Sequence, residues 1–464
     1  MSVPGRPTLR PIGWHCARPC LILFAAILLL GIAACGSSAS PVAARTAAPS
    51  ASRPASVGAV TDISGTPCDP ASAEVEDAAW HEFVYAAWIC LPRGSAGAMR
   101  IGFARSTDDG RTWSAPLDMP GSVRGWDPAV AVAPDGTLYV SFMTTRAGYM
   151  LPVVDVSRDD GATFPQSVAV RPPASGNFGD RDFITAGPHG VAYLTWDYAP
   201  TKRYVRDQCP PGGSCSFTAG ELNAVIQAST DYGATWGPIS HVSPGFPDGG
   251  ADLAPLLLGP GGRIDAVYQA MTDAGPPTYR VGAGHLYFTS SADGGRTWTR
   301  PVLIGPQAGS IATAAWWIDG AIAQDAGGTL YATWDTQAAG SDTGWLAYSA
   351  DGGVTWSVPV QVTQDAAPVP HIVQAAGGTP GLAYVGWLSD SSHSGYAQYL
   401  RVYQVGRGWL TRPLQVSAQF GRPAVWPGDT FGIATVPGTP PVLVLTWGSA
   451  VTGPSQIYSA RVTF

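Results

Sequence analysis

Acidic residues and one histidine recur at corresponding places along the chain, each just ahead of an apolar, strand-like segment. They are Glu74 or Glu76, Asp127, Asp180 and Asp182, Asp252, Asp319, His371 and Asp429. Aromatic residues stand just upstream of several of them: Trp126, Phe178, Phe246, Trp317 and Trp426. Carboxylates bind sugar hydroxyls, and aromatic rings stack on the C–H faces of sugars. Carboxyls gathered in one place also raise one another's pKa, which suits general acid catalysis.

Two interpretations of these residues stay open. In the functional one they converge on a shared site, where Asp127, Asp180 and Asp182 are the candidate catalytic residues and Asp127 works with one of the other two. The candidate substrate-binding residues are then Trp126, Arg181, Asp252, Trp317, Asp319, His371, Trp426 and Asp429. In the structural one the acids cap strand starts and the aromatics pack between units. Converging like charges cost stability unless they are used or paired, which favours a function for the set as a whole.

One octapeptide, Ser-x-Asp-x-Gly-x-Thr-Trp/Phe, occurs five times. The copies are Ser106–Trp113, Ser157–Phe164, Ser229–Trp236, Ser291–Trp298 and Ser349–Trp356. An Asp in this setting accepts backbone N–H bonds as in an Asx-turn, and the Gly supplies a positive φ that other residues reach only at a cost. We therefore predict a structural, turn-holding role for Asp108, Asp159, Asp231, Asp293 and Asp351.

These octapeptides resemble the Asp box, or BNR repeat, of the sialidase superfamily of β-propellers. The resemblance implies an all-β fold of four-stranded antiparallel blades, each box joining the third and fourth strands. Strand pairs ending in an aromatic recur seven times, at Trp88, Phe142, Trp196, Tyr268, Trp334, Trp387 and Trp447. Seven blades are therefore favoured over the six of sialidases. The segment around Ser56 to Ile63 is expected to supply the last strand and close the ring.

In such a propeller the recurring acids would ring the channel mouth at the end opposite the boxes. The resemblance then implies a protein that binds, and in one version hydrolyses, glycans there. A non-catalytic scaffold for a protein partner, an exo-sialidase and a neutral-sugar glycosidase stay open as alternatives. Sialidase chemistry needs three arginines and a Glu-activated Tyr. The candidates are Arg181, Arg401 and Arg422 with Tyr396, but the usual Phe-Arg-Ile-Pro motif is absent and no glutamate lies in the C-terminal half.

Composition limits the other classes of function. The 464 residues carry a net charge of -7, which argues against nucleic acid as a partner. Hydrophobic residues make up 45% and charged residues 13%, with 57 Gly, 42 Pro and 17 Trp, as short strands and tight turns require. The sequence has no phosphate loop and no zinc-ligand spacing. We expect a monomer without a cofactor or metal.

The N-terminal segment predicts export. Three arginines precede an apolar run from Leu21 to Ala34, and Ile32-Ala33-Ala34-Cys35 resembles a bacterial lipobox. The resemblance implies cleavage before Cys35, lipidation of its thiol and anchoring to the outer face of the cell membrane. An ordinary signal peptide is the alternative. We assign residues 1–35 to the signal peptide, 36–58 to an Ala/Ser/Pro-rich tether and 59–464 to the propeller.

Four cysteines remain beyond the leader and the anchor, an even number in an oxidising compartment: Cys68, Cys90, Cys209 and Cys215. Cys209 and Cys215 flank a short Pro/Gly loop, so we predict one disulfide between them and a second between Cys68 and Cys90. A metal site is the weaker alternative, because no His accompanies either pair. The first pair lies in a long insertion from about residue 197 to 223, either a wall of the channel mouth or surface decoration.

Overall fold

The structure is a computed structural model. It describes residues 55–65, 70–92, 99–200, 216–217, 223–242, 251–252, 255–273, 279–304, 321–338, 341–363, 369–390, 396–417, 428, 430–451 and 453–464. These residues fall within one compact unit, Arg53–Phe464. No helix in the described part of the chain is long and apolar enough to cross a membrane.

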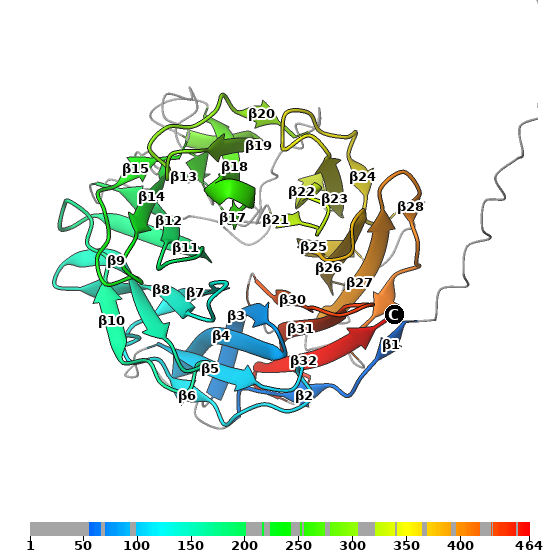
Figure 1. The fold of residues 1–464 in the computed structure, drawn as a ribbon, viewed down its shortest axis with the longest axis horizontal. Coiled ribbons are helices and arrows are strands. Elements are labelled where there is room, and N and C mark those ends of the chain that lie inside the picture. Colours follow the sequence, from blue (N-terminus) through cyan, green and yellow to red (C-terminus); the bar gives the residue numbers. More distant parts are fainter. Residues whose placement is uncertain are drawn as a thin grey trace, which may run out of the picture. The chain divides into compact units, whose positions relative to one another are not determined.

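The unit is built from seven antiparallel sheets arranged in a ring (Figure 1). Blade 1 holds β3 (Pro70–Trp80), β4 (Phe83–Pro92), β5 (Arg100–Ser106) and β6 (Leu117–Asp118). Blade 2 holds β7 (Trp126–Val132), β8 (Leu138–Arg146), β9 (Tyr149–Ser157) and β10 (Gln166–Ala169). Blade 3 holds β11 (Phe178–Ala186), β12 (Ala192–Ala199), β14 (Asn223–Ser229) and β15 (Ser240–His241).

The remaining blades follow the same order, from the axis outward. Blade 4 holds β16 (Ala251–Asp252), β17 (Leu256–Leu258), β18 (Ile264–Asp273), β19 (Tyr279–Ser291) and β20 (Val302–Leu303), and β13 (Ser216–Phe217) pairs with β19. Blade 5 holds β21 (Ala321–Gln324), β22 (Leu330–Ala338), β23 (Ser341–Ser349) and β24 (Val360–Gln361). Blade 6 holds β25 (Val369–Gly377), β26 (Leu382–Asp390), β27 (Tyr396–Gln404), β28 (Gly408–Trp409) and β29 (Leu414–Gln415). Blade 7 holds β30 (Gly432–Val436), β31 (Val442–Ser449), β32 (Gln456–Thr463), β1 (Ser56–Val57) and β2 (Thr61–Asp62).

The two ends of the described chain close the ring. Ser56 pairs with Thr463 and Thr61 with Ser459, so β1 and β2 complete the blade that begins at β30. Neighbouring inner strands contact one another in the order β3, β7, β11, β17, β21, β25, β30 and back to β3. Closure leaves no open sheet edge between blades. The all-β propeller, its seven blades and the closing role of the segment around Ser56 to Ile63 are confirmed.

A buried aromatic in the second strand of each blade forms the packing between blades. The set is Trp88, Phe142, Trp196, Tyr268, Trp334, Trp387 and Trp447, each 3% exposed or less. Trp88 needs a glycine beside it, because a Cβ at Gly102 would meet its Nε1 at 2.6 Å. These aromatics alternate with small neighbours on the pleated strands, which is how adjacent twisted sheets interdigitate.

The five octapeptides join third and fourth strands, and their aspartates hold turns. In the last copy Ser349 Oγ donates to Asp351 Oδ1 at 2.7 Å, and Thr355 donates through its N–H to Oδ1 at 2.9 Å and through Oγ1 to Oδ2 at 2.6 Å. Gly353 has a φ of 90°. The Thr hydroxyl is the largest cause that lowers the pKa of Asp351 to about 2, and the same holds for Asp159 and Asp293. These hydrogen bonds hold the turn in place.

Each of the first four octapeptides is also tied to the blade before it. Arg461 Nε donates to the Asp109 carbonyl at 2.7 Å, and Arg105 donates to the Asp160 carbonyl at 2.6 Å. Gln166 Nε2 donates to the Tyr232 carbonyl at 2.8 Å, and Ser240 Oγ donates to the Gly295 carbonyl at 2.5 Å. The boxes are therefore joints between blades as well as turns within them.

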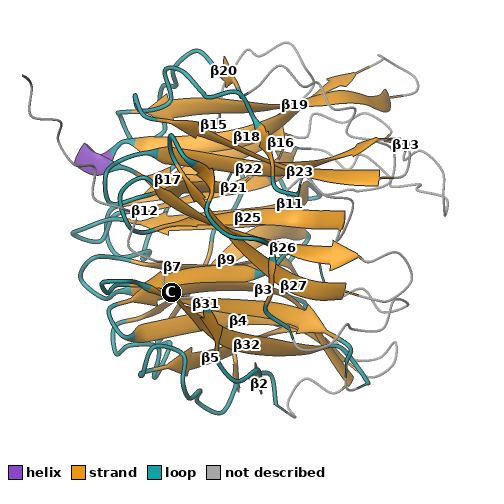
Figure 2. Cartoon of the chain, turned by 90° about the vertical axis from the view of Figure 1, so that its right-hand side faces the viewer, coloured by secondary structure: helices purple, strands orange, loops and turns teal. Residues whose placement is uncertain are grey.

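The topology separates two ends of the unit. The octapeptides and the turns from first to second strands lie at the same end, and the Asp109 N–H donates to the carbonyl of Glu82 in such a turn at 2.8 Å. Figure 2 shows these turns gathered at the left, together with η1 (Pro260–Gly262), the corresponding turn of blade 4. The inner strands begin at the other end, so Asp127 in β7 and Asp180 in β11, near the first residues of their strands, lie opposite the octapeptides.

Candidate functional site

Four inner strands carry the same backbone kink near their first residues. Glu74, Asp127, Arg181 and Ile372 have φ values of 52°, 48°, 33° and 49°. Each lies where the pairing with the second strand shifts register. A β-bulge of this kind re-aims side chains, and a left-handed backbone at a residue other than Gly persists only where its surroundings fix it.

In three consecutive blades the kinked residue is charged: Glu74 in β3, Asp127 in β7 and Arg181 in β11. Inner strands of neighbouring blades touch, so these residues form one arc at the start of β3, β7 and β11. We call Glu74, Glu76, Asp127, Asp180, Arg181 and Asp182 the mouth cluster. It contains all three residues predicted to be catalytic.

The carboxyls of Asp127 and Asp180 form a hydrogen-bonded pair. Trp126 Nε1 donates to Asp180 Oδ1 at 3.0 Å, and the Arg181 N–H donates to Asp127 Oδ2 at 3.2 Å. Burial raises the pKa of Asp180 well above its ordinary value, and the charge of Asp127 and the hydrogen bond between the two carboxyls add to the rise. A direct bond between two carboxyls requires a proton, and the raised pKa of Asp180 makes Asp180 the carboxyl that carries it.

Arg181 and Asp182 lie deeper than this pair, at 4% and 1% exposed. The Arg181 guanidinium is 3.8 Å from Glu76 Oε1 and lies over the Phe183 ring at 5.3 Å. Burial raises the pKa of Asp182; the Ser141 hydroxyl and Arg181 oppose the rise, while Asp127 adds to it. The cluster thus combines several carboxyls with one guanidinium, and its deeper members are buried from water.

Asp77, three residues after the kink in β3, serves the joint between blades 1 and 7. Thr446 Oγ1 donates to its Oδ2 at 2.9 Å. Burial raises the pKa of Asp77 well above its ordinary value. A Cβ at Gly432 would collide with the carboxyl carbon of Asp77. This acid is packed between blades and has a structural role.

The chain segment that carries Trp126 and Asp127 into the cluster is fixed to blade 2. The Gly121 N–H donates to Asp155 at 3.2 Å, Arg146 donates to the Gly121 carbonyl at 2.7 Å, and Thr144 donates to the Val123 carbonyl at 2.9 Å. Burial raises the pKa of Asp155 to about 6. The sequence did not single out Asp155, because a lone acid within an apolar strand carries no motif.

Several residues predicted for the site have no described side chain. Asp252 lies in β16 and His371 in β25, where only the backbone is described, and His371 directly precedes the kink at Ile372. Phe246, Trp317, Asp319, Trp426 and Asp429 lie outside the described residues. Their convergence on the mouth stays a prediction.

The arginine set of the sialidase alternative changes. Arg401, one candidate for that set, lies in the third strand of blade 6, stacks 4.5 Å from the Trp409 ring centroid and donates to the Val362 carbonyl of blade 5 at 2.7 Å. The strand alternation turns Arg401 to the joint with blade 5. Arg422 lies outside the described residues.

The predicted disulfides stay predictions. Cys90 is buried in β4, whereas Cys35, Cys68, Cys209 and Cys215 lie outside the described residues. Most of the predicted insertion lies outside them as well, but β13 within it pairs with β19, Ser216 opposite Arg280. In the described part of the chain no three His, Cys, Asp or Glu side chains are grouped to hold a metal ion.

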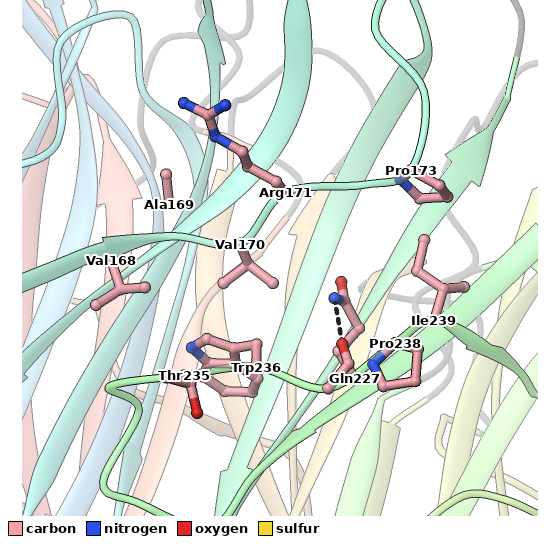
Figure 3. A pocket seen from close by; sticks show the side chains of 11 residues that line it. Val168, Ala169, Val170, Arg171, Pro173, Gln227, Thr235, Trp236, Pro238 and Ile239 are labelled. Carbon is pink, nitrogen blue, oxygen red and sulfur yellow. Dashed lines mark hydrogen bonds between the residues drawn. The ribbon is translucent and has the colours of Figure 1, made fainter.

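A cavity of about 610 Å³ lies away from the mouth cluster, on the outer rim between blades 2 and 3. It is lined by the end of β10 with the segment that follows it, including Arg171, and by the end of the third octapeptide with the segment that follows it, including Trp236 and Ile239. Figure 3 shows Arg171 extending away from Trp236, with Gln227 bonded to the Gly237 carbonyl. Its lining has no carboxyl, so it lacks the acid groups that the mouth cluster offers.

Comparison with known proteins supports the fold. No protein-family model matches the chain, and no curated protein matches it. A protein of unknown function from Dyadobacter fermentans has a TM-score of 0.54 at 15% identity, over 88% of this chain and 99% of that one. An ulvan lyase, a polysaccharide lyase bound to a GlcA–Rha3S saccharide, has a TM-score of 0.53 at 13% identity, over 87% and 93%. The NanB sialidase of Streptococcus pneumoniae has a TM-score of 0.43 at 14% identity, over 84% and 68%. The two neighbours with TM-scores above 0.5 agree with the β-propeller fold of this chain and show the fold alone.

Proposed function

We propose that the protein binds glycans at the channel mouth opposite its Asp boxes, through the mouth cluster of blades 1 to 3. The observation that carries this proposal is the hydrogen-bonded Asp127–Asp180 pair, built on two kinked inner strands and flanked by Trp126 and Arg181. A carboxyl pair with one proton both donates and accepts, which matches the paired hydroxyls of a sugar ring. The half-buried Trp126 adds an aromatic surface beside the pair.

Binding rather than hydrolysis is the primary function that this geometry favours. Retaining glycosidases hold their two carboxyls about 5–5.5 Å apart and inverting ones about 6.5–9.5 Å apart. Two carboxyl groups joined by a direct hydrogen bond, which is one cause of the raised pKa of Asp180, lie closer together than either spacing. Asp127 and Asp180 therefore act as one acid–base unit. Hydrolysis would need a second carboxyl farther away, and Glu76 on blade 1 is a described candidate.

The test is a glycan-array screen of the purified protein, followed by calorimetry on the best ligand. Asp127→Asn and Asp180→Asn are expected to weaken binding about tenfold or more, since each removes the shared proton or an acceptor. Asp118→Asn is the matched control. It removes the same charge, but from the outer strand β6, where Asp118 forms an exposed ion pair with Arg100. Equal affinity in all four proteins, or binding only to a protein partner, would overturn the proposal.

We further propose that the protein is exported and anchored by a lipid on Cys35. The support is the apolar run that stops at a cysteine preceded by small residues. Metabolic labelling with an alkyne fatty acid is expected to tag the wild type and not Cys35→Ala. Equal labelling of both proteins would contradict a lipid on this thiol.

A further inference from the structure

The charges on β3, β7, β11 and β12 around the kinks are unbalanced. From β7 comes Asp127, from β11 come Asp180, Asp182 and Arg181, and from β3 come Glu74 and Glu76. Asp197 of β12 stands opposite Asp180 in the pairing of the two strands, and Asp77 adjoins Glu76. In this set Arg181 is the single cation, and it already contacts Glu76 and the ring of Phe183.

Asp182 is a buried carboxyl with few hydrogen-bond donors around it. It is 1% exposed, neither of its carboxyl oxygens receives a hydrogen bond of good geometry from the described residues, and the nearby Ser141 hydroxyl offsets the effect of burial on its pKa only in part. A buried carboxyl with so little support from donors is costly, so the fold retains a group here that a positive charge nearby would stabilise. Asp127 and Asp180 are half-buried, so they are more accessible than Asp182.

We infer that the ligand of the mouth cluster carries a primary ammonium group, as an amino sugar with a free amine does; this rests on the proposed glycan binding. An ammonium has three N–H donors and a positive charge, so it bridges the two carboxyls in place of the proton that they share. A carboxylate or sulfate on the sugar finds Arg181 already engaged and meets several acids instead.

Binding then releases a proton. The pair with one proton has a charge of minus one; it takes up the ammonium and passes its proton to the buffer, so atoms and charge balance. Burial and the charge of Asp127 raise the pKa of Asp180, so the pair keeps its proton to a higher pH than an ordinary aspartate would. Affinity is expected to rise with pH as the pair loses its proton and to fall again where the amine of the ligand becomes neutral.

The experiment compares three oligosaccharides by calorimetry with the full-length protein: a β-1,4-linked glucosamine tetramer, the same tetramer fully N-acetylated, and a galacturonate tetramer. The first two tetramers have the same sugar backbone. They differ only in the group on each sugar, which is an ammonium in the first and a neutral acetamide in the second. We expect the glucosamine tetramer to bind about tenfold tighter than its acetylated form. We also expect about one proton released per site, measured from the binding enthalpy in buffers of different ionisation enthalpy. Asp127→Asn should abolish both effects, and Asp118→Asn should leave them unchanged.

The outcomes separate the two proposals. Binding of the acetylated or galacturonate tetramer as tightly as the glucosamine tetramer, lost in Asp127→Asn, would leave glycan binding standing and overturn the ammonium inference. The same holds for ammonium binding without proton release. No binding of any tetramer here or of any glycan in the array would overturn the proposed function itself. Proton release is measured on the wild type, so the test survives a variant that folds poorly.

Discussion

Asp127 and Arg181 lie in a backbone conformation that residues other than glycine rarely adopt. Their φ values are 48° and 33°, and left-handed positions of this kind cost about 1–3 kcal/mol each. The bond from the Arg181 N–H to Asp127 Oδ2 links the two kinks directly. Such strain, together with a pair of converging carboxyls, is what a functional site retains and what a structural cap would avoid.

This distinction predicts how the pair affects stability. Asp127→Asn is expected to raise the free energy of unfolding at pH 7 by about 1 kcal/mol, because it removes a charge beside Asp180 and Asp182. Asp159→Asn in an octapeptide should lower it, since that carboxylate accepts bonds from Ser157 and Thr163. Urea unfolding measures both. Destabilisation by Asp127→Asn would support the alternative in which the acids merely cap strands.

Asp155 predicts a pH dependence of its own. Its pKa is about 6 in the folded protein, against an ordinary value of 3.8. The proton is bound more tightly in the folded state, so this group stabilises the fold below about pH 4 and loses that contribution as pH rises to 6. Two pKa units correspond to about 3 kcal/mol. Asp155→Asn should gain stability relative to the wild type by up to that amount between pH 4 and 6; a constant difference across the range would refute the assignment.

Among the elements, the octapeptide turns depend on glycine for two separable reasons. At Gly353 the φ is 90° and a Cβ would collide with the Phe288 ring of the preceding blade. At Gly406, in the turn between β27 and β28 of blade 6, which is not an octapeptide, the φ is 76° and a Cβ would meet nothing within 4 Å.

Gly353→Ala is therefore expected to cost about 2–4 kcal/mol and Gly406→Ala about 1 kcal/mol. The difference isolates the collision with Phe288 from the backbone strain that both variants share. Thermal unfolding of the two variants beside the wild type provides the measurement. Equal losses would mean that the ring moves aside freely and that the joint between blades 4 and 5 is not tightly packed.

The octapeptides could be read from the sequence because their bonds are local. Ser349, Asp351 and Thr355 bond within six residues of one another, so one short motif specifies the turn. The kinks could not be read, because a bulge depends on register against a partner strand and no glycine marks it. The sequence predicts that Asp127 and Asp180 share a site. It does not predict their direct hydrogen bond, because the two residues are 53 positions apart and the bond depends on how blades 2 and 3 pack.

For the whole molecule, closure of the ring sets the inner strands at their fixed places. Ser64, buried near the start of the described chain, donates to Gln456 Oε1 at 2.6 Å and accepts from the Ile457 N–H at 3.1 Å. Ser64→Ala leaves both partners unmet and is expected to lower the free energy of unfolding by about 1–3 kcal/mol. The exposed Ser175→Ala is the control. If Ser64→Ala left the free energy of unfolding unchanged, strand pairing with β32 alone would hold the ring closed.

The order of the seven blades also explains why the mouth cluster forms where it does. Acids precede most inner strands, but the described charged kinks belong to three consecutive blades, so the arc faces one side of the axis. The octapeptides, each with one aspartate at the same position of the motif, lie at the opposite end of the unit and contribute no residue to the mouth cluster.

A crystal structure of the protein with a bound oligosaccharide tests the central claim most directly. The account predicts sugar density within hydrogen-bond distance of Asp127 and Asp180, beside Trp126, at the end of the unit opposite the Asp boxes. Density seated on the octapeptide face, or in the rim cavity at Trp236, with an empty mouth, would contradict it.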